Sequence, residues 1–230
     1  MAPPAALVFD LDGTLIDSRR DITTAVNRMR SGLGLPPLAL EAVVTMVGEG
    51  ARRLMERALP ERPDRIDQAL ARYLEHYWEV CLETTRPYPR VEGMLSALAG
   101  RYPLALLSNK GEALSRKILD GLGLLRHFRE ILGGDSAPTR KPDPAGLRLL
   151  AERLGIPVER LLLVGDTWID AETAKNAGCA FALVEWGFPR SPKLDGVKAD
   201  LRAATAEELT AALMTRLPDA DNHCLPLIGQ

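Results

Sequence analysis

Cysteine is scarce in this chain of 230 residues, which has three, at Cys81, Cys179 and Cys224. Their number is odd, and no CxxC pair or Cys/His group has the spacing of a zinc site. The sequence therefore indicates neither a disulfide framework nor a structural zinc. Scattered, reduced cysteines are typical of the cytoplasm, which is the expected location.

Long apolar runs and an excess of basic residues are also missing. Charge, glycine or proline interrupts every hydrophobic run, and the first residues lack the pattern of a secretion signal. The chain has 29 lysines and arginines against 31 aspartates and glutamates, unlike proteins that bind nucleic acid by neutralising phosphates. We therefore expect neither a membrane nor a nucleic-acid partner.

The chain does contain short apolar segments, each bounded by polar residues or glycine. The segments expected to be buried strands are Ala5–Phe9, Leu104–Leu107, Glu130–Leu132, Leu161–Val164, Ala180–Val184 and, more weakly, Ala199–Leu201. The amphipathic segments of helical length between them are Val91–Ala99, Glu112–Leu122, Pro144–Leu154 and Ile169–Ala177. This alternation predicts an α/β fold with a doubly wound, mostly parallel, Rossmann-like sheet.

The interval between the first two strands is too long for a simple crossover. The helices expected within it run from Ser18 toward Arg30, and over Leu40–Met46, Gly50–Leu59 and Asp64–Cys81. We interpret residues 17–87 as an all-helical cap inserted into a catalytic core of residues 1–16 and 88–230. Because the insertion follows the first strand, the cap would cover the edge where open α/β sheets bind ligands.

Two carboxylates follow the first strand, in Asp10-Leu11-Asp12-Gly13-Thr14-Leu15. Carboxylates this close repel each other unless a cation lies between them or one of them is protonated as a general acid while the other attacks. Gly13 allows the tight turn that such a site needs. A solvent-exposed Asp-Gly turn is the alternative interpretation.

Polar residues also follow the next three strands. Ser108 and Asn109 precede a helix, where hydroxyl and backbone N–H groups can hold a phosphate. Lys141 can neutralise phosphoryl charge. Asp166 and Asp170 can bind and orient Mg²⁺, which prefers carboxylate oxygens. Each motif alone also fits the start of a helix, but all of them converge on one edge of the sheet.

In this order the motifs resemble the haloacid dehalogenase-like superfamily, and nearly the whole chain resembles its phosphoglycolate phosphatase branch. The segments that carry the branch resemblance are Val47-Gly48-Glu49-Gly50, Arg57-Ala58-Leu59, Asn109-Lys110, Gly133-Gly134-Asp135 and Lys141-Pro142-Asp143-Pro144. Two segments differ from the branch: Trp168-Ile169-Asp170 stands where Arg-Asn-Asp is frequent, and Trp186-Gly187-Phe188 where Tyr-Gly-Tyr is frequent.

The resemblance implies roles for four acidic residues. Asp10 would be the nucleophile and a magnesium ligand. Asp12 would be the general acid and base, with its backbone carbonyl on the metal. Asp166 would bind the same ion, and Asp170 would support that site. Dehalogenating relatives lack an acid at the position of Asp12, so the resemblance favours phosphoryl transfer.

The resemblance also implies how phosphate and substrate are held. The residues that would bind the phosphoryl group are Thr14, Ser108 and Asn109. Lys141 would neutralise its charge. The cap segment that the family turns toward the substrate contains Gly48, Glu49 and Gly50. Arg52 or Arg53 could contact a substrate carboxylate, and the alternative is that both are solvated surface arginines.

These residues lead us to expect magnesium-dependent hydrolysis of a small phosphate ester, 2-phosphoglycolate, through an aspartyl-phosphate on Asp10. Pyrophosphatases, nucleotide and sugar-phosphate phosphatases and phosphomutases use the same four motifs, and the sequence leaves them open. The alternative from another class is a phosphate-ligand sensor without turnover, although such relatives typically lose the nucleophile, acid or lysine. The chain is expected to be a monomer or a homodimer.

Overall fold

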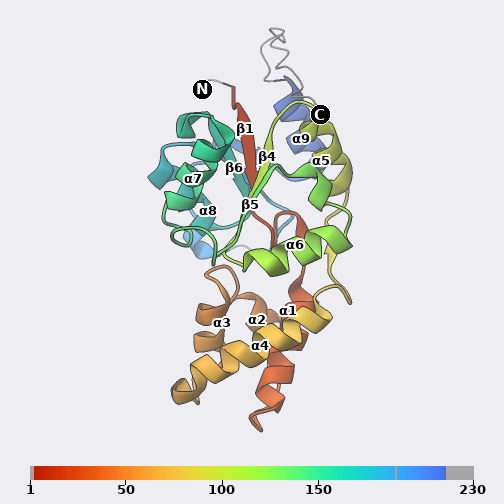
Figure 1. Ribbon diagram of the computed structural model, residues 1–230, viewed down its shortest axis with the longest axis vertical. Coiled ribbons are helices and arrows are strands. Elements are labelled where there is room, and N and C mark those ends of the chain that lie inside the picture. Colours follow the sequence, from red (N-terminus) through yellow and green to blue (C-terminus); the bar gives the residue numbers. More distant parts are fainter. Residues whose placement is uncertain (1–2, 190, 216–230) are drawn as a thin grey trace, which may run out of the picture.

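The computed structural model describes residues 3–189 and 191–215, and a six-stranded parallel sheet lies at its centre (Figure 1). Its strands are β1 (Ala6–Phe9), β4 (Leu104–Leu107), β5 (Glu130–Leu132), β6 (Leu161–Gly165), β7 (Ala180–Val184) and β8 (Leu201–Ala203). Their spatial order is β5-β4-β1-β6-β7-β8, and all neighbours are parallel. The chain winds outward from β1 in both directions, so the crevice for a ligand lies beside β1.

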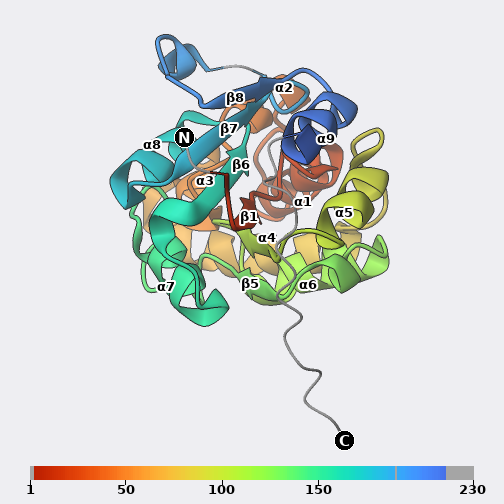
Figure 2. The same cartoon turned by 90° about the horizontal axis from the view of Figure 1, so that it is seen from above.

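Helices cover both faces of the sheet (Figure 2). Those on one face are α5 (Val91–Ala99), α6 (Glu112–Gly121) and α9 (Ala206–Thr215), and those on the other are α7 (Ala145–Leu154) and α8 (Trp168–Ala177). Leu7 and Phe9 of β1 point into one apolar core, and Ala6 and Val8 into the other. Both faces of the strand are buried, which explains its continuous apolar sequence. The predicted doubly wound, mostly parallel sheet is confirmed.

Two elements near the end of the sequence differ from expectation. The last strand begins at Leu201 and not at Ala199. Directly before it, the Asp200 carboxylate takes the place of a backbone carbonyl and accepts from the Phe181 N–H of β7 at 2.9 Å. Helix α9 was not anticipated, and its buried Leu209 and Leu213 complete one apolar core. The sequence of Thr215–Gln230 predicts a loosely held tail, and all of this segment except Thr215 lies outside the described residues.

Four helices form a group beyond the carboxyl ends of the strands (Figure 1). They are α1 (Arg19–Ser31), α2 (Leu40–Val44), α3 (Ala51–Ala58) and α4 (Ile66–Val80), with a short 3₁₀ turn, η1 (Pro63–Arg65), before α4. All four fall inside the interval interpreted as a cap. The division into residues 17–87 and the remainder stays a prediction. None of the helices in the described ranges is both long enough and apolar enough to span a membrane.

A two-stranded antiparallel ribbon connects this helical group with the sheet. It consists of β2 (Ile16–Asp17) and β3 (Arg86–Pro87). Asp21, which is buried at the start of α1, accepts hydrogen bonds from the backbone N–H and hydroxyl groups of Thr84 and Thr85. This buried carboxylate ties both passages of the chain together beside the sheet edge.

Candidate active site

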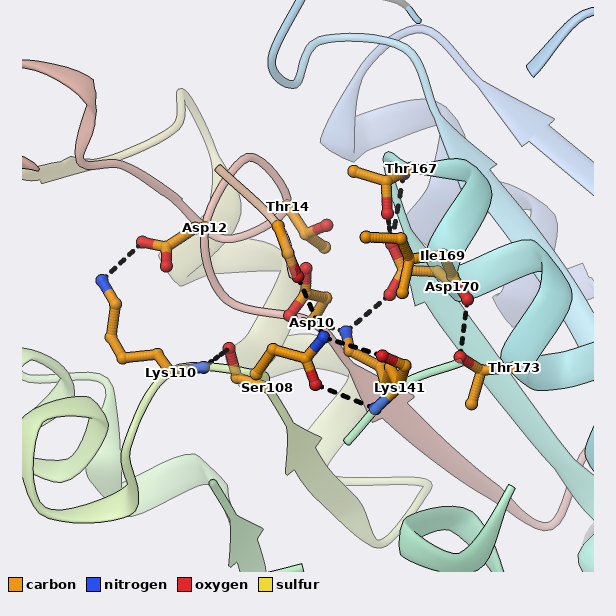
Figure 3. A network of polar contacts seen from close by, with 12 residues as sticks. Asp10, Asp12, Thr14, Ser108, Lys110, Lys141, Thr167, Ile169, Asp170 and Thr173 are labelled. Carbon is orange, nitrogen blue, oxygen red and sulfur yellow. Dashed lines mark hydrogen bonds and ion pairs between the residues drawn. The ribbon is translucent and has the colours of Figure 1, made fainter. Parts of the chain in front are cut away.

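Loops that follow strands bring the candidate residues to one edge of the sheet (Figure 3). Asp10 follows β1, Ser108 follows β4 and Asp166 follows β6, and β1 lies between the other two strands. Lys141 comes from the segment between β5 and α7. Parallel strands end at the same edge, so residues far apart in the sequence meet beside β1.

The Lys141 ammonium lies between two carboxylates. Its Nζ is 2.9 Å from Asp10 Oδ1 and 2.6 Å from Asp170 Oδ1, and the lysine side chain is 2% exposed. Burial raises the pKa of Asp10 to about 6, against the attraction of Lys141 and with the repulsion of Asp170. Burial by itself would lower the pKa of Lys141, but the two carboxylates raise it. The lysine therefore stays charged and holds Asp10 in a fixed orientation.

Asp166 is a third buried carboxylate at this point. Its Oδ1 accepts from the Thr14 hydroxyl, and its Oδ2 accepts from the Phe188 N–H, both at 3.0 Å. Burial, followed by repulsion from Asp170 and Asp10, raises the pKa of Asp166 well above its ordinary value. Within the described ranges, neutral donors orient this carboxylate group and no cationic side chain pairs with it.

These acidic residues fit a divalent metal ion. Carboxylate oxygens of Asp10, Asp166 and Asp170 lie within 4.8 Å of one another. One lysine cannot offset three buried carboxylates, and hard oxygen ligands are those that Mg²⁺ prefers. Asp170 already accepts from Lys141 at one oxygen and from Thr167 N–H and hydroxyl at the other. Among the described residues, Asp170 accepts three hydrogen bonds and Asp166 two, and Asp10 is paired with Lys141 at one oxygen. Asp10 and Asp166 thus keep more capacity to bind a metal ion, and the supporting role of Asp170 stays a prediction.

Gly13 is needed where the first motif passes this cluster. Its φ is +86°, and a Cβ atom there would lie 2.2 Å from Asp166 Oδ2. A side chain would be strained and would displace the carboxylate. The Asp-Gly pair is therefore part of the site and not a solvent-exposed turn.

The carboxylate of Asp12 points away from the cluster (Figure 3). Its Oδ1 accepts from Lys110 Nζ at 2.7 Å and from the Ser18 hydroxyl at 2.5 Å. Lys110 also donates to the Tyr77 hydroxyl on α4 at 2.6 Å. Ser18 stands at the expected start of a helix, where serine often caps the first turn, but its side chain makes no cap hydrogen bond there. Two carboxylates from one turn thus occupy different electrostatic environments.

The three residues expected to bind phosphate make different contacts. The Thr14 hydroxyl donates to Asp166. The amide of Asn109 donates to the carbonyls of Gly48 at 2.9 Å and Lys141 at 3.0 Å, and accepts from the Lys141 N–H. Ser108 Oγ accepts from the Lys110 N–H at 3.3 Å and lines a pocket. Their role in phosphate binding stays a prediction.

This pocket has a volume of about 70 Å³ and lies between the sheet edge and the helices α1, α3 and α4. Its polar side chains on the core side are Asp10, Asp12, Ser108, Asn109, Lys110 and Thr167. Its apolar and aromatic side chains from the helical group are Ile22, Val47, Ala51, Leu54, Tyr73, Leu74 and Tyr77. A ligand here would meet charge on one side and an apolar surface on the other.

The expected cap residues divide into two pairs. Gly48 and Gly50 line the pocket, and both have positive φ, +122° and +90°. A Cβ atom at Gly50 would lie 3.3 Å from the carbonyl oxygen of Asn109. The side chain of Glu49 pairs with Arg57, and that of Arg52 pairs with Asp67 at 2.6 Å on the exposed surface.

The segment after β7 also builds the site, and its part was missed by sequence reasoning. Gly187 packs so closely that a Cβ atom would lie 2.5 Å from the Asp166 side chain. Phe188 lines the pocket as well as bonding Asp166. The Trp186 indole N–H donates to the carbonyl of Thr14 at 3.0 Å. The position of this segment directly after a strand was the signal available in the sequence. The hydrogen bond from the Phe188 N–H could not be predicted, because a residue of almost any type can supply a backbone donor.

Comparison with known proteins gives consistent matches. The model of the haloacid dehalogenase-like hydrolase family matches residues 7–184. A phosphoglycolate phosphatase of Rhodospirillum rubrum is 41% identical over 199 residues, 82% of this chain and 83% of the relative. One of Thiobacillus denitrificans is 36% identical over 219 residues, 92% of this chain and 96% of the relative. The crystal structure of a predicted phosphoglycolate phosphatase from Haemophilus somnus 129pt has a TM-score of 0.86 at 30% identity, and the match covers 92% of this chain and 99% of that one.

Proposed function

The chain belongs to the haloacid dehalogenase-like hydrolase family, in its phosphoglycolate phosphatase branch, and we propose that it hydrolyses 2-phosphoglycolate through an aspartyl-phosphate on Asp10. Membership of this branch makes it a phosphoric monoester hydrolase. The observation that carries the mechanism is the separation of two carboxylates on one turn: Asp10 is held by Lys141, and Asp12 by Lys110 on the pocket wall.

In the first half of the reaction, a carboxylate oxygen of Asp10 attacks phosphorus. The bond from phosphorus to the ester oxygen breaks, and Asp12, which enters this step as the protonated carboxylic acid, gives that oxygen its proton, so that glycolate leaves with its hydroxyl intact. In the second half, water attacks phosphorus and gives a proton to Asp12. The bond to Asp10 then breaks, and both carboxyl groups return to their starting state.

Mg²⁺ held by Asp10, Asp166 and the backbone carbonyl of Asp12 would neutralise charge on the phosphoryl group and on the carboxylates. Asp170 keeps Lys141 beside Asp10, and the Thr14 hydroxyl fixes the orientation of Asp166. These contacts keep the anionic groups in place before substrate arrives, which lowers the cost of reorganisation during the reaction.

The phosphoryl group would lie against the Ser108 hydroxyl and the N-terminal end of α6, with Lys141 nearby. Backbone N–H groups at a helix start favour an anion. Thr14 and Asn109 would complete this binding site, Asn109 chiefly through the loop that it ties to Lys141.

The helical group would act as a cap that selects the leaving group. Its apolar pocket wall offers few partners for the hydroxyls of a sugar or the polar edges of a nucleobase. A small ester therefore fits better than a sugar phosphate or a nucleotide, and the names of the most similar curated relatives agree. Gly48 and Gly50 would let the cap approach the core. We also propose a cytoplasmic location, and the chain as a monomer or homodimer.

The direct test is phosphate release from 2-phosphoglycolate, pyrophosphate, a nucleoside monophosphate and a hexose phosphate. Each reaction is run with Mg²⁺, with EDTA, and with Asp10→Asn. Release that needs Mg²⁺, is lost in Asp10→Asn and is fastest with 2-phosphoglycolate supports the proposal. Preference for another ester overturns the substrate, transfer of phosphate to a second sugar position indicates a mutase, and phosphate binding without any release indicates a sensor.

A further inference from the structure

The pocket wall carries one cationic side chain in the part of the chain that the structure describes. Its charged residues are Asp10, Asp12 and Lys110. The other polar side chains of the wall are neutral, and the helical group contributes no charge to it. An anionic group on a substrate, other than the phosphate, would therefore find a single positive partner in Lys110.

Two hydrogen bonds hold the Lys110 ammonium in place, but they do not use all of its donors. Its side chain is 7% exposed, and Nζ donates to Asp12 Oδ1 at 2.7 Å and to the Tyr77 hydroxyl at 2.6 Å. Nζ also lies 4.6 Å from the centre of the Tyr77 ring, in a cation–π contact. A lysine ammonium has three donors. Among the described residues, the third hydrogen meets no acceptor.

The position of Lys110 relative to the reaction follows from Asp12. In the proposed mechanism Asp12 reaches the ester oxygen, and Lys110 contacts the same carboxyl group. In a phosphorylated 2-hydroxy acid of two carbons, the carboxylate carbon lies two bonds from that ester oxygen. Such a carboxylate comes within reach of Lys110. In a longer leaving group, the carbon at the same distance from the ester oxygen carries apolar or hydroxyl substituents instead of a carboxylate.

We propose that Lys110 determines specificity by binding the carboxylate of the leaving group, with Tyr77 holding the ammonium in position. The ligand class is a short phosphorylated 2-hydroxy acid. This inference rests on the proposed function, since it assigns a partner to the substrate group that distinguishes 2-phosphoglycolate from other small esters. It also gives an exposed arginine of the cap, Arg52, no part in recognition.

The test compares two esters that differ only in that group: 2-phosphoglycolate, and 2-hydroxyethyl phosphate, where a hydroxymethyl group replaces the carboxylate. The ratio of their kcat/KM values is measured for the wild-type protein and for Lys110→Met. Because Asp12 also loses a bond, both values fall, but the ratio is expected to fall by about 30-fold, the worth of a hydrogen bond to a charged group.

A matched control is Lys117→Met. Lys117 also lies over a ring of α4, 4.4 Å from the centre of Trp78, but it is not part of the pocket wall. The ratio is expected to stay unchanged in this variant. Tyr77→Phe keeps the ring and removes only the hydroxyl, and it is expected to lower the ratio by about 3-fold, so the proposal can be judged even if Lys110→Met does not fold.

The outcomes separate this inference from the proposed function. A fall in the ratio for Lys110→Met and Tyr77→Phe, with none for Lys117→Met, supports it. If Lys110→Met loses the same factor in kcat/KM with both esters, Lys110 only positions Asp12, and the inference is overturned. It is also overturned if the wild-type protein hydrolyses both esters equally well. A wild-type protein that hydrolyses neither ester overturns the proposed function and this assignment together.

Discussion

The two sides of the pocket are built from different groups. On the core side, buried charged side chains contact one another; for example, Lys141 pairs with both Asp10 and Asp170. On the helical side the wall is apolar, and the charges of Glu49 and Arg52 pair with other residues of that group. A change among the buried charges of Asp10, Lys141 and Asp170 should therefore abolish the chemistry, whereas a change on the helical side should alter how an ester is bound and leave kcat nearly unchanged.

The largest effect should come from Lys141→Met. Without the ammonium, Asp10 and Asp170 repel each other and the incoming phosphoryl group lacks a positive partner. We expect kcat for 2-phosphoglycolate to fall by about 10³-fold, as when a preorganised donor is removed. Phosphate release at saturating Mg²⁺ measures this. Lys175→Met on α8, where the lysine is 74% exposed, should match the wild type. A loss of less than tenfold for Lys141→Met would contradict the assigned role.

Magnesium should stabilise the folded protein by relieving repulsion among Asp10, Asp166 and Asp170. At a hundredfold excess over its Kd, a ligand of the folded state adds about 2.7 kcal/mol, and we expect Tm to rise by about 5 to 10 °C. Asp166→Asn should lose most of this rise, yet be at least as stable as the wild type in EDTA, because it removes one buried negative charge. Thermal unfolding of both proteins with Mg²⁺ and with EDTA measures the Tm rise on metal binding and the difference in Tm without metal. A full Tm rise in Asp166→Asn would contradict its place as a ligand.

The metal-free protein should show an unusual dependence of stability on pH. The folded state raises the pKa of Asp10 to about 6 from 3.8, so it holds that proton more tightly than the unfolded chain does. The contribution of Asp10 to the free energy of unfolding is fully present below about pH 4 and is lost as the pH rises through about 6. We expect the difference in unfolding free energy between the wild type and Asp10→Asn to change by about 2 kcal/mol across this range, measured by urea denaturation in EDTA. A flat difference would contradict the raised pKa.

The same contrast explains how much the sequence could reveal. The strand β1 and the acidic residues after it follow from a continuous apolar segment and the rule that ligands bind at strand ends. The contact of Lys110 with Tyr77 could not be predicted in this way, because it depends on how α4 packs against the start of α6. Likewise, the N–H of Phe188 acts on Asp166 through the backbone, which any residue could supply.

A moderate effect is expected on the helical side from Gly50→Ala. The residue has φ +90° and its new Cβ atom would lie 3.3 Å from the Asn109 carbonyl, so the loop must shift. We expect a loss of stability of about 1 kcal/mol and a rise of KM of about 3-fold to 10-fold, with kcat nearly unchanged. Steady-state kinetics gives both constants. Gly155→Ala is a suitable control, because its φ is also positive, +66°, but its added Cβ would meet open space and the residue is not part of the pocket wall. If kcat falls as strongly in Gly50→Ala as in Lys141→Met, the assignment of chemistry to the core side and of ester binding to the helical side is wrong.

The smallest effect should come from Arg52→Ala. Sequence reasoning left this arginine open as a ligand for a substrate carboxylate, but its side chain is 47% exposed, bonds Asp67 and is not part of the pocket wall. An ion pair of this kind contributes little to stability. We expect KM for 2-phosphoglycolate to stay within about twofold of the wild type, against a large change for Lys110→Met. If Arg52→Ala raises KM tenfold while Lys110→Met does not, the carboxylate is bound from the helical side, and the apolar wall seen there must rearrange around the substrate.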